Sequence, residues 1–424
     1  MQKEKITSEE IVHQVASAYV AKYSPLTLED TFETCLYDSD AGVYIPARAH
    51  LMQYCENILQ NASSNHIVRE IGEKVKRMSF TKRETFDQDA RILNVKNGLL
   101  NLYTGELLPH SPGYPSLIQL PVNYDKDADC PAIKSFLYEV LTDDERRKVI
   151  KMLGDILLPG YPYQSFYFLV GAGNNGKGTL GRLIKAFVGN SLISSVRLHA
   201  LADDRFATAD LYNKLVNFAG DVASSEIKDW ALVRSLTGGD TIRVQRKHAQ
   251  PFEMVNRAKL IFAFNKLPEM DPDYSSFRRL VMITFDRIFE GEDKDRGLDA
   301  KLHAPSELCG LLNLALEGIS MLREDDGFDE SWVETKARYE RLQNEFKMFI
   351  EDEFIVDEAE KVPVELVRDE YVKWAKKTKR TILDGQAVGQ RMAALGFENK
   401  QNRSTKVRYY HGLRLRGNSG QEKL

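Results

Sequence analysis

Residues 166–187 read FYFLVGAGNNGKGTLGRLIKAF: an apolar run, a glycine-rich loop, and a run of apolar residues with helical spacing. A glycine-rich loop that joins a strand to a helix is the context of a phosphate-binding loop. There the glycines let backbone N–H groups surround a phosphate, a lysine neutralises its oxygens, and the helix N-terminus adds a favourable dipole. We therefore expect a nucleotide site formed by Gly171, Gly173, Asn174, Asn175, Gly176, Lys177, Gly178 and Thr179.

The loop departs from the usual pattern at one position. A Ser or Thr normally follows the lysine directly, and its hydroxyl group binds Mg²⁺. Here Gly178 holds that position, and the hydroxyl group comes one residue later, at Thr179. Either Thr179 binds the metal, or Thr179 contacts phosphate while water and a distant carboxylate hold the metal. The sequence leaves both alternatives open.

Short apolar runs alternate with helical patterns and loops around this segment. Besides FYFLV, they are LVNFA at residues 215–219, LIFAF at 260–264 and LVMITF at 280–285. Alternation of this kind predicts a parallel sheet flanked by helices. We place this α/β nucleotide-binding domain at residues 128–328.

Two polar residues follow predicted strands of this sheet. Asp221 comes after the second run, and an acid there typically binds Mg²⁺ through water and helps to orient the attacking water. Alternatively, Asp221 simply caps the next helix, and Glu226 is either a second acid or a solvated helix residue. Asn265 comes after the third run, where its amide can polarise the water that attacks a γ-phosphate. A plain turn before Pro268 is the alternative for Asn265.

The regions on either side of this domain differ in character. Residues 1–127 read as a mixed α/β domain, with helical spacing at 8–23 and a predicted hairpin around Asn97-Gly98. Residues 329–424 begin with a charged helix, predicted at 329–349, and continue as a smaller unit. We therefore expect three domains.

The C-terminal region carries a strong local asymmetry of charge. The formal net charge of the chain is −4, yet residues 371–417 hold twelve Lys or Arg and two acids, whereas residues 351–370 hold nine acids and two bases. A local basic face, and not the overall charge, determines phosphate binding. Two predicted helices precede a basic strand-like stretch at 406–416, which suggests a winged-helix-like domain with Arg391 near bases or phosphates. A solvated basic face is the alternative.

Composition argues against several other classes of protein. The four cysteines lack CxxC spacing, which argues against a disulfide framework and against a zinc finger. No run approaches the roughly 20 apolar residues of a membrane span, and the first residues have no apolar signal core. We therefore expect a cytoplasmic protein with no membrane partner.

Taken in order, the motifs resemble those of the superfamily 3 helicases, specifically the poxvirus-type primase–helicase branch with its phage, plasmid and mobile-element relatives. The segments that carry the resemblance are GAGNNGKGT at 171–179, KLVNFAGD at 214–221, SLTGGDTIRVQRKHAQPFEM at 235–254, KLIFAFNKLP at 259–268 and SSFRRLVMITF at 275–285. The resemblance implies an AAA+-like P-loop ATPase core that uses ATP and Mg²⁺. It implies catalytic roles for Lys177, Asp221 and Asn265, with Thr179 and Asp221 at the metal.

The resemblance also implies two groups of basic site residues. In these proteins the segment before the Asn-bearing strand forms a hairpin in the channel of a ring, and the matching residues here are Arg243, Arg246, Lys247 and His248. Basic side chains at the end of such a hairpin bind DNA phosphates independently of the base sequence. Arg278 or Arg279 matches an arginine finger that reaches the nucleotide of a neighbouring subunit. An ordinary solvated hairpin and a salt-bridged surface pair are the respective alternatives.

The activity that the resemblance implies is that of an ATP-dependent DNA helicase. Such a protein forms a hexameric ring on single-stranded DNA and unwinds forked duplex with 3′ to 5′ polarity, in the host-cell compartment where a virus, phage, plasmid or mobile element replicates. A separate primase or polymerase is an expected kind of partner. Larger relatives carry a fused primase, but we expect none here, because fewer than about 130 residues precede the matching region and lack a zinc-type Cys/His cluster.

Two other functional classes compete with this interpretation. One is an ATP-regulated replication initiator or loader that binds origin DNA without processive unwinding. The other is a small-molecule P-loop kinase, which would need neither the basic hairpin nor the basic C-terminal region, and whose ATP hydrolysis DNA would leave unchanged.

Overall fold

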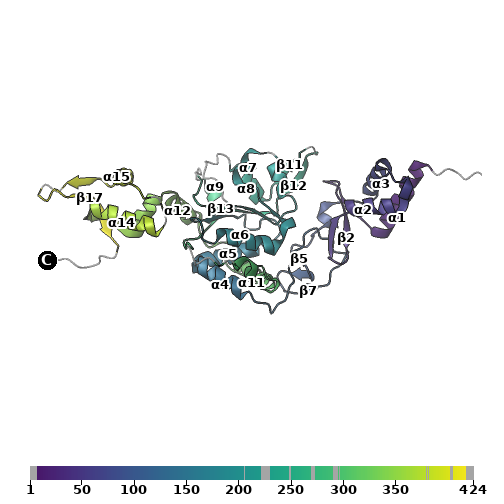
Figure 1. Ribbon diagram of the computed structural model, residues 1–424, viewed down its shortest axis with the longest axis horizontal. Coiled ribbons are helices and arrows are strands. Elements are labelled where there is room, and N and C mark those ends of the chain that lie inside the picture. The colour runs from purple at the N-terminus through teal and green to yellow at the C-terminus, as the bar shows by residue number, and fades with distance from the viewer. Residues whose placement is uncertain are drawn as a thin grey trace, which may run out of the picture. The chain divides into compact units, whose positions relative to one another are not determined.

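The computed structural model describes residues 7–204, 206–220, 230–247, 250–268, 273–289, 295, 297–378, 380, 382–401 and 404–416. The chain forms two compact units. The first unit consists of Met1–Ala223, Ile227–Asn265 and Asp273–Glu330, and the second of Ser224–Glu226, Lys266–Pro272 and Ser331–Leu424. Figure 1 shows both units and labels many of their elements.

The N-terminal part of the first unit combines helices with two small sheets. Its helices are α1 (Ser8–Tyr23), α2 (Arg48–Leu59) and α3 (Asn65–Met78), with short 3₁₀ helices at Gln60–Ala62 and Arg83–Thr85. One sheet has the order β3-β2-β1-β4 and the other β5-β6-β7. The strands are β1 (Leu26–Leu28), β2 (Thr34–Asp38), β3 (Val43–Pro46), β4 (Phe80–Thr81), β5 (Ile92–Val95), β6 (Gly98–Asn101) and β7 (Leu107–Leu108).

Local sequence signals account for two of these elements. Thr7 and Glu10 form a reciprocal capping box at the start of α1, so the helix begins where its apolar spacing predicts. The turn between β5 and β6 consists of Lys96 and Asn97, one residue earlier than the predicted Asn97-Gly98, and Gly98 is the first residue of β6, paired with Val95. The predicted helix and hairpin are confirmed.

The central sheet of the first unit has five parallel strands in the order β14-β8-β13-β10-β9. They are β8 (Phe166–Val170), β9 (Ile193–Ser194), β10 (Val216–Ala219), β13 (Lys259–Phe264) and β14 (Leu280–Thr284). The predicted mixed α/β fold with a parallel sheet is confirmed. The short edge strand β9 was not predicted.

Helices, a hairpin and 3₁₀ turns surround this sheet. The helices are α4 (Pro131–Val140), α5 (Asp143–Leu157), α6 (Lys177–Val188), α7 (Leu198–Asp203), α8 (Ala231–Gly238), α9 (Tyr274–Phe277), α10 (Leu298–Leu302) and α11 (Pro305–Glu324). The hairpin strands are β11 (Thr241–Val244) and β12 (Phe252–Val255), and the 3₁₀ helices are Asn190–Leu192 and Ala207–Leu211.

The central strands are apolar on both faces because protein covers both faces. On β8, Tyr167 and Leu169 belong to one core cluster with residues of α4, α5, α6 and α11. The alternate side chains, Phe166 and Phe168, contact the ring of Trp230 just before α8. Every residue of β8 and β13 is buried, which explains their continuous apolar runs in the sequence.

A buried ion pair lies at the start of β13. The Nζ atom of Lys259 donates to Oδ1 of Asp155 at 2.9 Å and to the carbonyl of Gly160 at 2.5 Å. The hydroxyl group of Tyr167 donates to Oδ2 of Asp155 at 2.6 Å. Burial lowers the pKa of Lys259, against the opposing effect of Asp155. The pair ties α5 to two neighbouring strands of the sheet.

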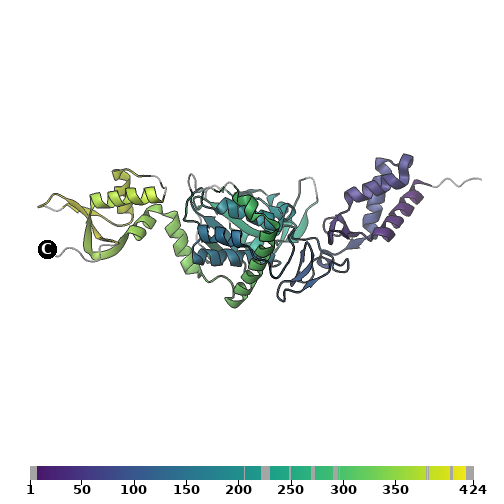
Figure 2. The ribbon, with the colours of Figure 1, turned by 60° about the horizontal axis from the view of Figure 1, so that its bottom comes forward.

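The second unit consists of helices and one antiparallel sheet with the order β15-β17-β16. Its core is aromatic and aliphatic, with Phe349, Trp374 and Leu413 buried together. Figure 2 shows its helices beside the sheet. The elements are α12 (Trp332–Gln343), α13 (Glu345–Glu353), β15 (Phe354–Pro363), α14 (Val364–Lys377), α15 (Gly385–Ala394), β16 (Asn399–Gln401) and β17 (Arg408–Leu415).

The predicted single helix at 329–349 is wrong. The structure has two helices, α12 and α13, which meet at Asn344. The side chain of Asn344 accepts a hydrogen bond from the backbone N–H of Lys347 at 3.0 Å and so caps the second helix. Helical spacing continues on both sides of the break, and for this reason the sequence pattern did not reveal it.

Candidate nucleotide site and nucleic-acid interface

The glycine-rich loop, residues 171–176, joins the end of β8 to the start of α6. Gly176 precedes α6 with φ 97°, a conformation that glycine adopts without strain. A Cβ atom at Gly171 would lie 2.4 Å from the carbonyl oxygen of Phe285, so a side chain there would displace backbone. These two glycines allow the tight path of the loop.

Lys177 is the first residue of α6, and its side chain folds back into the loop. The residue is 7% exposed. Its Nζ atom donates to the carbonyls of Gly171 at 2.6 Å and Ala172 at 2.9 Å, and to Oδ1 of Asn175 at 3.1 Å. The ammonium group therefore lies inside the loop, at the N-terminus of a helix.

Asn175 connects this lysine to the neighbouring strand β14. Its Nδ2 atom donates to the carbonyl of Phe285, the residue after β14, at 2.9 Å. The backbone N–H of Phe289 donates to the carbonyl of Asn174 at 2.8 Å. The segment that leaves β14 thus forms one wall of the loop.

Thr179 has a side-chain partner that the sequence did not indicate. Its Oγ1 atom accepts a hydrogen bond from Nη2 of Arg182 at 3.1 Å, and Nε of Arg182 donates to Oδ2 of Asp299 at 2.8 Å. Asp299 belongs to α10, far along the chain, so no local motif predicts this contact. The candidate metal ligand Thr179 is therefore next to a guanidinium group.

Asn265 lies beside the loop at the carboxyl edge of the sheet. It follows β13, whose Phe264 pairs with Val170, the last residue of β8. The backbone N–H of Gly171 donates to the carbonyl of Phe264 at 3.2 Å. The next strand, β10, ends at Ala219 on the same edge, but Asp221 and Glu226 lie outside the described residues.

The two candidate finger arginines lie at the opposite edge of the sheet. The carbonyl of Arg279 accepts a hydrogen bond from the backbone N–H of Phe166, the first residue of β8, at 2.9 Å. Arg278 is exposed, and its Nη2 atom donates to Oε1 of Gln164 at 2.9 Å. The pair is therefore separated from the glycine-rich loop by the length of β8.

Arg279 itself is largely buried, with 9% exposure. Its Nη1 atom donates to the carbonyl of Ser275 at 2.7 Å, whereas its buried Nε atom has no hydrogen-bond partner among the described residues. Burial lowers the pKa of Arg279, and the nearby charges of Arg278 and Arg234 lower it further. Of the two arginines, Arg278 is the one whose side chain faces solvent.

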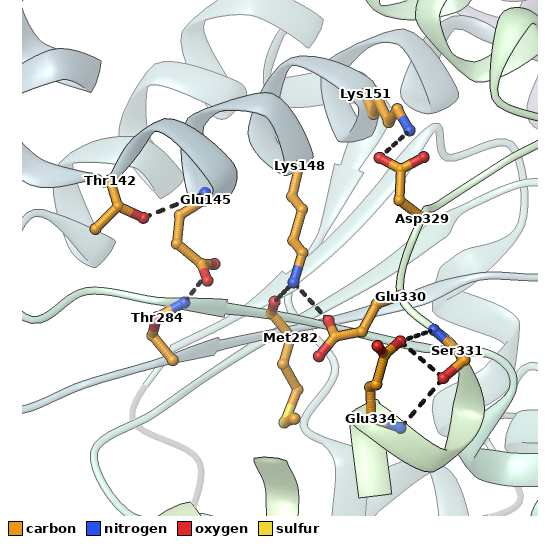
Figure 3. A network of polar contacts seen from close by, with 10 residues as sticks. All are labelled: Thr142, Glu145, Lys148, Lys151, Met282, Thr284, Asp329, Glu330, Ser331 and Glu334. Carbon is orange, nitrogen blue, oxygen red and sulfur yellow. Dashed lines mark hydrogen bonds and ion pairs between the residues drawn. The ribbon is translucent and has the colours of Figure 1, made fainter. Parts of the chain in front are cut away.

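A polar network joins α5 to β14 and to the segment after α11 (Figure 3). Nζ of Lys148 donates to Oε2 of Glu330 at 2.5 Å and to the carbonyl of Met282 at 3.4 Å. Lys151 is paired with Asp325 at 2.8 Å and Asp329 at 2.9 Å. These bonds hold the segment after α11 against α5, and the pocket beside them, of about 320 Å³, is lined by Lys148, Tyr163, Gln164, Arg278 and Glu330.

The hairpin β11–β12 presents three of the four basic residues expected there. Arg243, Arg246 and Lys247 are exposed, and His248 lies outside the described residues. Arg243 pairs across the hairpin with Glu253. Arg246 and Lys247 border a hollow of about 870 Å³ along the sheet edge, which is also lined by Ser195, Arg197, Tyr212 and Lys214.

The basic residue expected in the C-terminal region lies on a helix surface. Arg391 is exposed on α15, while Val388 and Met392 of the same helix are buried in the core of the second unit. The exposed strand residues Lys400 and Arg408 pair with other residues across β16 and β17. A basic helix face and a basic hairpin thus occur in one unit.

Two further observations limit the chemistry of the described residues. No group of three or more His, Cys, Asp or Glu side chains among them could hold a metal ion. None of the described helices combines the length and the apolar character that a membrane crossing needs.

Two family models match this chain. Residues 2–142 match the family described as D5 N terminal like, and residues 169–279 match the family of unknown function DUF5906. The first match covers the N-terminal helices and small sheets as well as α4. The second runs from the end of β8 through the glycine-rich loop and the hairpin to Arg279.

One curated relative and one solved structure extend these matches. A protein of Acanthamoeba polyphaga mimivirus named "Putative helicase" is 24% identical over 296 residues, which are 66% of this chain. The match spans 30% of the length of that relative. The apo structure of the NrS-1 C terminal region (305–718) matches with a TM-score of 0.52 and 14% identity, over 97% of this chain and 100% of that chain. At that identity the similarity is one of fold.

These matches agree with the resemblance carried by the ordered motifs. The D5-like N-terminal match and the helicase-named relative come from sequence, and the NrS-1 region adds the fold. Together, the D5-like match, the helicase-named relative and the fold of the NrS-1 region fit the resemblance of this chain to the phage and viral superfamily 3 primase–helicases.

Proposed function

We propose that this chain is an ATP-dependent DNA helicase with an AAA+-like P-loop core, which forms a ring on single-stranded DNA and unwinds duplex during replication of a virus, phage, plasmid or mobile element. The observation that carries the proposal is the arrangement around β8. Its carboxyl end leads into the glycine-rich loop beside Asn265, and its first residue pairs with Arg279. The glycine-rich loop and the arginine pair therefore lie at opposite ends of one strand. A single subunit cannot bring these two parts together in one active site.

The loop fits the phosphates of a nucleoside triphosphate. The first turn of α6 and the backbone of residues 172–176 supply N–H donors, and Lys177 supplies a positive charge in the same place. On binding, Lys177 exchanges its bonds to loop carbonyls for bonds to β- and γ-phosphate oxygens. We assign Asn265 to orienting the attacking water.

Thr179 and Asp221 are the residues that would hold Mg²⁺. The Oγ1 atom of Thr179 is an oxygen ligand of the right type, but Arg182 donates a hydrogen bond to it, and a cation would compete for the same lone pairs. We therefore expect Arg182 to turn away from Thr179 when the metal binds. Bound Mg²⁺ neutralises the charge that develops on the transferred phosphoryl group.

The arginine pair supports a ring in which each active site lies between two subunits. The five residues of β8 span about 17 Å, so the arginines at one end cannot reach the loop at the other. Because Arg278 is exposed and Arg279 is buried, we assign the inserting finger to Arg278. Arg279 then holds the turn from α9 into β14 through its bond to Ser275.

Two basic surfaces support DNA as the partner. Arg243, Arg246 and Lys247 project from a hairpin, as expected of residues that grip successive phosphates. In the second unit the order helix, strand, helix, helix, strand, strand, from α13 to β17, supports a winged-helix-like domain, with Arg391 on the third helix. We propose that this second unit binds the duplex part of a forked DNA, while one DNA strand enters the ring.

A strand-separation assay tests the proposal. Purified chain and ATP should release the labelled strand of a forked duplex, and single-stranded DNA should raise the rate of ATP hydrolysis. The matched control is Lys177→Ala, which should do neither. Binding to duplex DNA with slow hydrolysis and no strand release would favour the initiator or loader. Hydrolysis that DNA leaves unchanged would point to a kinase-like enzyme instead.

A further inference from the structure

Tyr212 contacts two arginines that come from distant parts of the first unit. Cζ of Arg83, in the N-terminal part, lies 4.5 Å from the centre of the Tyr212 ring, and Cζ of Arg246, in the hairpin, lies 5.2 Å from it. The ring is 7% exposed. Phe252 of β12 meets Tyr212 edge to face with ring centres 4.9 Å apart, and Arg246 also lies 5.6 Å from the Phe252 ring.

Arg83 is held in place by hydrogen bonds to its neighbours. Its Nε atom donates to Oδ2 of Asp30 at 2.5 Å, and its Nη1 atom donates to Oδ1 of Asn213 at 3.1 Å. The hydroxyl group of Tyr212 also donates to Oδ2 of Asp30, at 3.4 Å. Asp30 precedes β2 and Arg83 follows β4, so the N-terminal part holds Tyr212 through both its hydroxyl group and its ring.

The other arm of the hairpin meets the same N-terminal part. Arg257, which follows β12, lines a small pocket of about 50 Å³ together with Phe86, Asp87 and Met254. Asp87 is anchored there, since its carboxylate accepts from Oγ of Ser116 at 2.6 Å and from the backbone N–H of Leu117 at 3.3 Å. The second arm therefore lines the same pocket as Arg83 and Asp87, whereas Arg246 reaches Arg83 through Tyr212.

We infer that Arg83 is a positioning residue for the hairpin: held by Asp30, it fixes Tyr212, and Tyr212 in turn orients the guanidinium group of Arg246. The inference rests on the proposed function, in which Arg246 binds DNA phosphate. An arginine side chain loses considerable conformational freedom when it binds, and a stacked, partly fixed guanidinium group has already lost part of it. The N-terminal part thereby contributes to DNA affinity without touching DNA.

A double-mutant cycle on single-stranded DNA affinity tests this in the full chain, with a fluorescent oligothymidine as the probe. Arg83→Ala should weaken binding by about three- to tenfold, the range of a partly buried cation–π contact. In the Arg246→Ala background the same change should have almost no further effect, because the group to be oriented is gone. Fully additive losses would overturn the inference.

Conservative variants separate positioning from a simple charge effect. Arg83→Lys keeps the charge but loses the flat guanidinium group, and it should not restore affinity, whereas rescue by lysine would mean that Arg83 contacts phosphate itself. Tyr212→Phe keeps the ring and should bind almost normally, whereas Tyr212→Leu should behave like Arg83→Ala. Arg91→Ala removes an exposed arginine of the same N-terminal part, which is paired with Asp89, and should leave affinity unchanged.

A measurement without DNA distinguishes this inference from the proposed function. Hydrogen exchange of the amides of β11 and β12 should be faster in Arg83→Ala than in the parent or in Arg91→Ala. If the parent does not bind DNA but the exchange changes as expected, the proposed function fails and the positioning of the hairpin stands. Unchanged exchange in a folded Arg83→Ala chain would overturn the positioning role whatever the DNA result.

Discussion

The backbone N–H of Phe166 donates to the carbonyl of Arg279, which fixes the arginine pair at the start of the strand whose other end carries the glycine-rich loop. Because no arginine can span that strand, we predict that the finger acts between subunits. Lys177→Ala and Arg278→Ala chains should each be inactive alone and regain partial ATP hydrolysis when mixed. Loss of such a finger typically costs about 10³-fold or more in turnover, so modest recovery is measurable.

The control for this mixing experiment pairs Lys177→Ala with a chain that carries both substitutions, which offers no complete interface and should stay inactive. The same mixture with Arg279→Ala tests our assignment of the finger to Arg278. Full activity in a dilute preparation shown to be monomeric would rule out both the finger and the obligate ring.

Lys177→Ala should abolish ATP hydrolysis while the fold remains intact. The substitution removes the one ammonium group inside the loop, where it binds three oxygen atoms of the chain's own residues. Phosphate release measures the rate, and thermal unfolding checks the fold. Lys185→Ala, an exposed lysine on the same helix, is the matched control and should keep the parental rate.

Asp221→Asn should block hydrolysis but preserve nucleotide binding.

Charge reversal in the hairpin should uncouple ATP hydrolysis from DNA. We expect Lys247→Glu combined with His248→Ala to keep basal hydrolysis and to lose DNA stimulation and strand separation. Each lost phosphate contact should also flatten the dependence of log affinity on log salt by about one unit. Lys126→Glu makes the same charge change at an exposed site elsewhere in the first unit. A double variant that unwinds normally would show that the hairpin is dispensable.

Removal of the second unit should separate duplex binding from hydrolysis. The charge break near Glu351 suggests a cut there, but Phe346, Phe349 and Ile350 belong to the core of the second unit, so the cut belongs after Glu330. The bonds from Lys148 and Lys151 to residues 325–330 then stay within the fragment. We expect a folded ATPase whose duplex affinity falls by about tenfold or more. Insoluble protein would indicate that the second unit is needed for folding.

The buried pair of Lys259 and Asp155 should show strong non-additivity in stability. Lys259→Met leaves a buried carboxylate without its ion partner and should lower the free energy of unfolding by about 3–5 kcal/mol. Lys259→Met with Asp155→Leu removes both charges and should cost less than the sum of the single changes. Chemical denaturation measures the free energy of unfolding of Lys259→Met, of Asp155→Leu and of the double variant. Equal and additive losses would mean that the two side chains do not depend on each other.

Much of the fold could be predicted because local signals and tertiary structure agree there. The runs at β8, β13 and β14 are continuous and apolar, as expected for strands covered on both faces, and the run at β10 is interrupted by the polar residue Asn217. The strand β9 could not be predicted, because its two residues form a strand only by pairing with β10. Its sequence, Ile193-Ser194, carries no strand pattern of its own.

The placement of the candidate site could be predicted where the site is contiguous and not where it is assembled from distant residues. The loop residues around Lys177 come from one stretch, and Asn265 could be expected beside them because carboxyl ends of parallel strands share an edge. The partners Arg182 and Asp299, and likewise Arg83 and Tyr212, are more than a hundred residues apart in the chain. No spacing rule in a single sequence links such residues, and only the packing of the helices and the N-terminal part brings them together.

The strand β14 has a consequence for timing in the proposed ring. It begins directly after Arg279, and the residue that follows it, Phe285, is bonded to Asn175, which in turn accepts from Lys177. In a ring, the two ends of β14 would belong to successive catalytic centres. Because the strand is closely packed, a displacement at one end would be transmitted to the other end. ATP hydrolysis at one subunit interface would then favour hydrolysis at the next interface. The rate of hydrolysis should depend on ATP concentration with a Hill coefficient above one, and the subunits should hydrolyse ATP in sequence around the ring. In a ring of Asn175→Ala chains, the catalytic centres should hydrolyse ATP independently of one another.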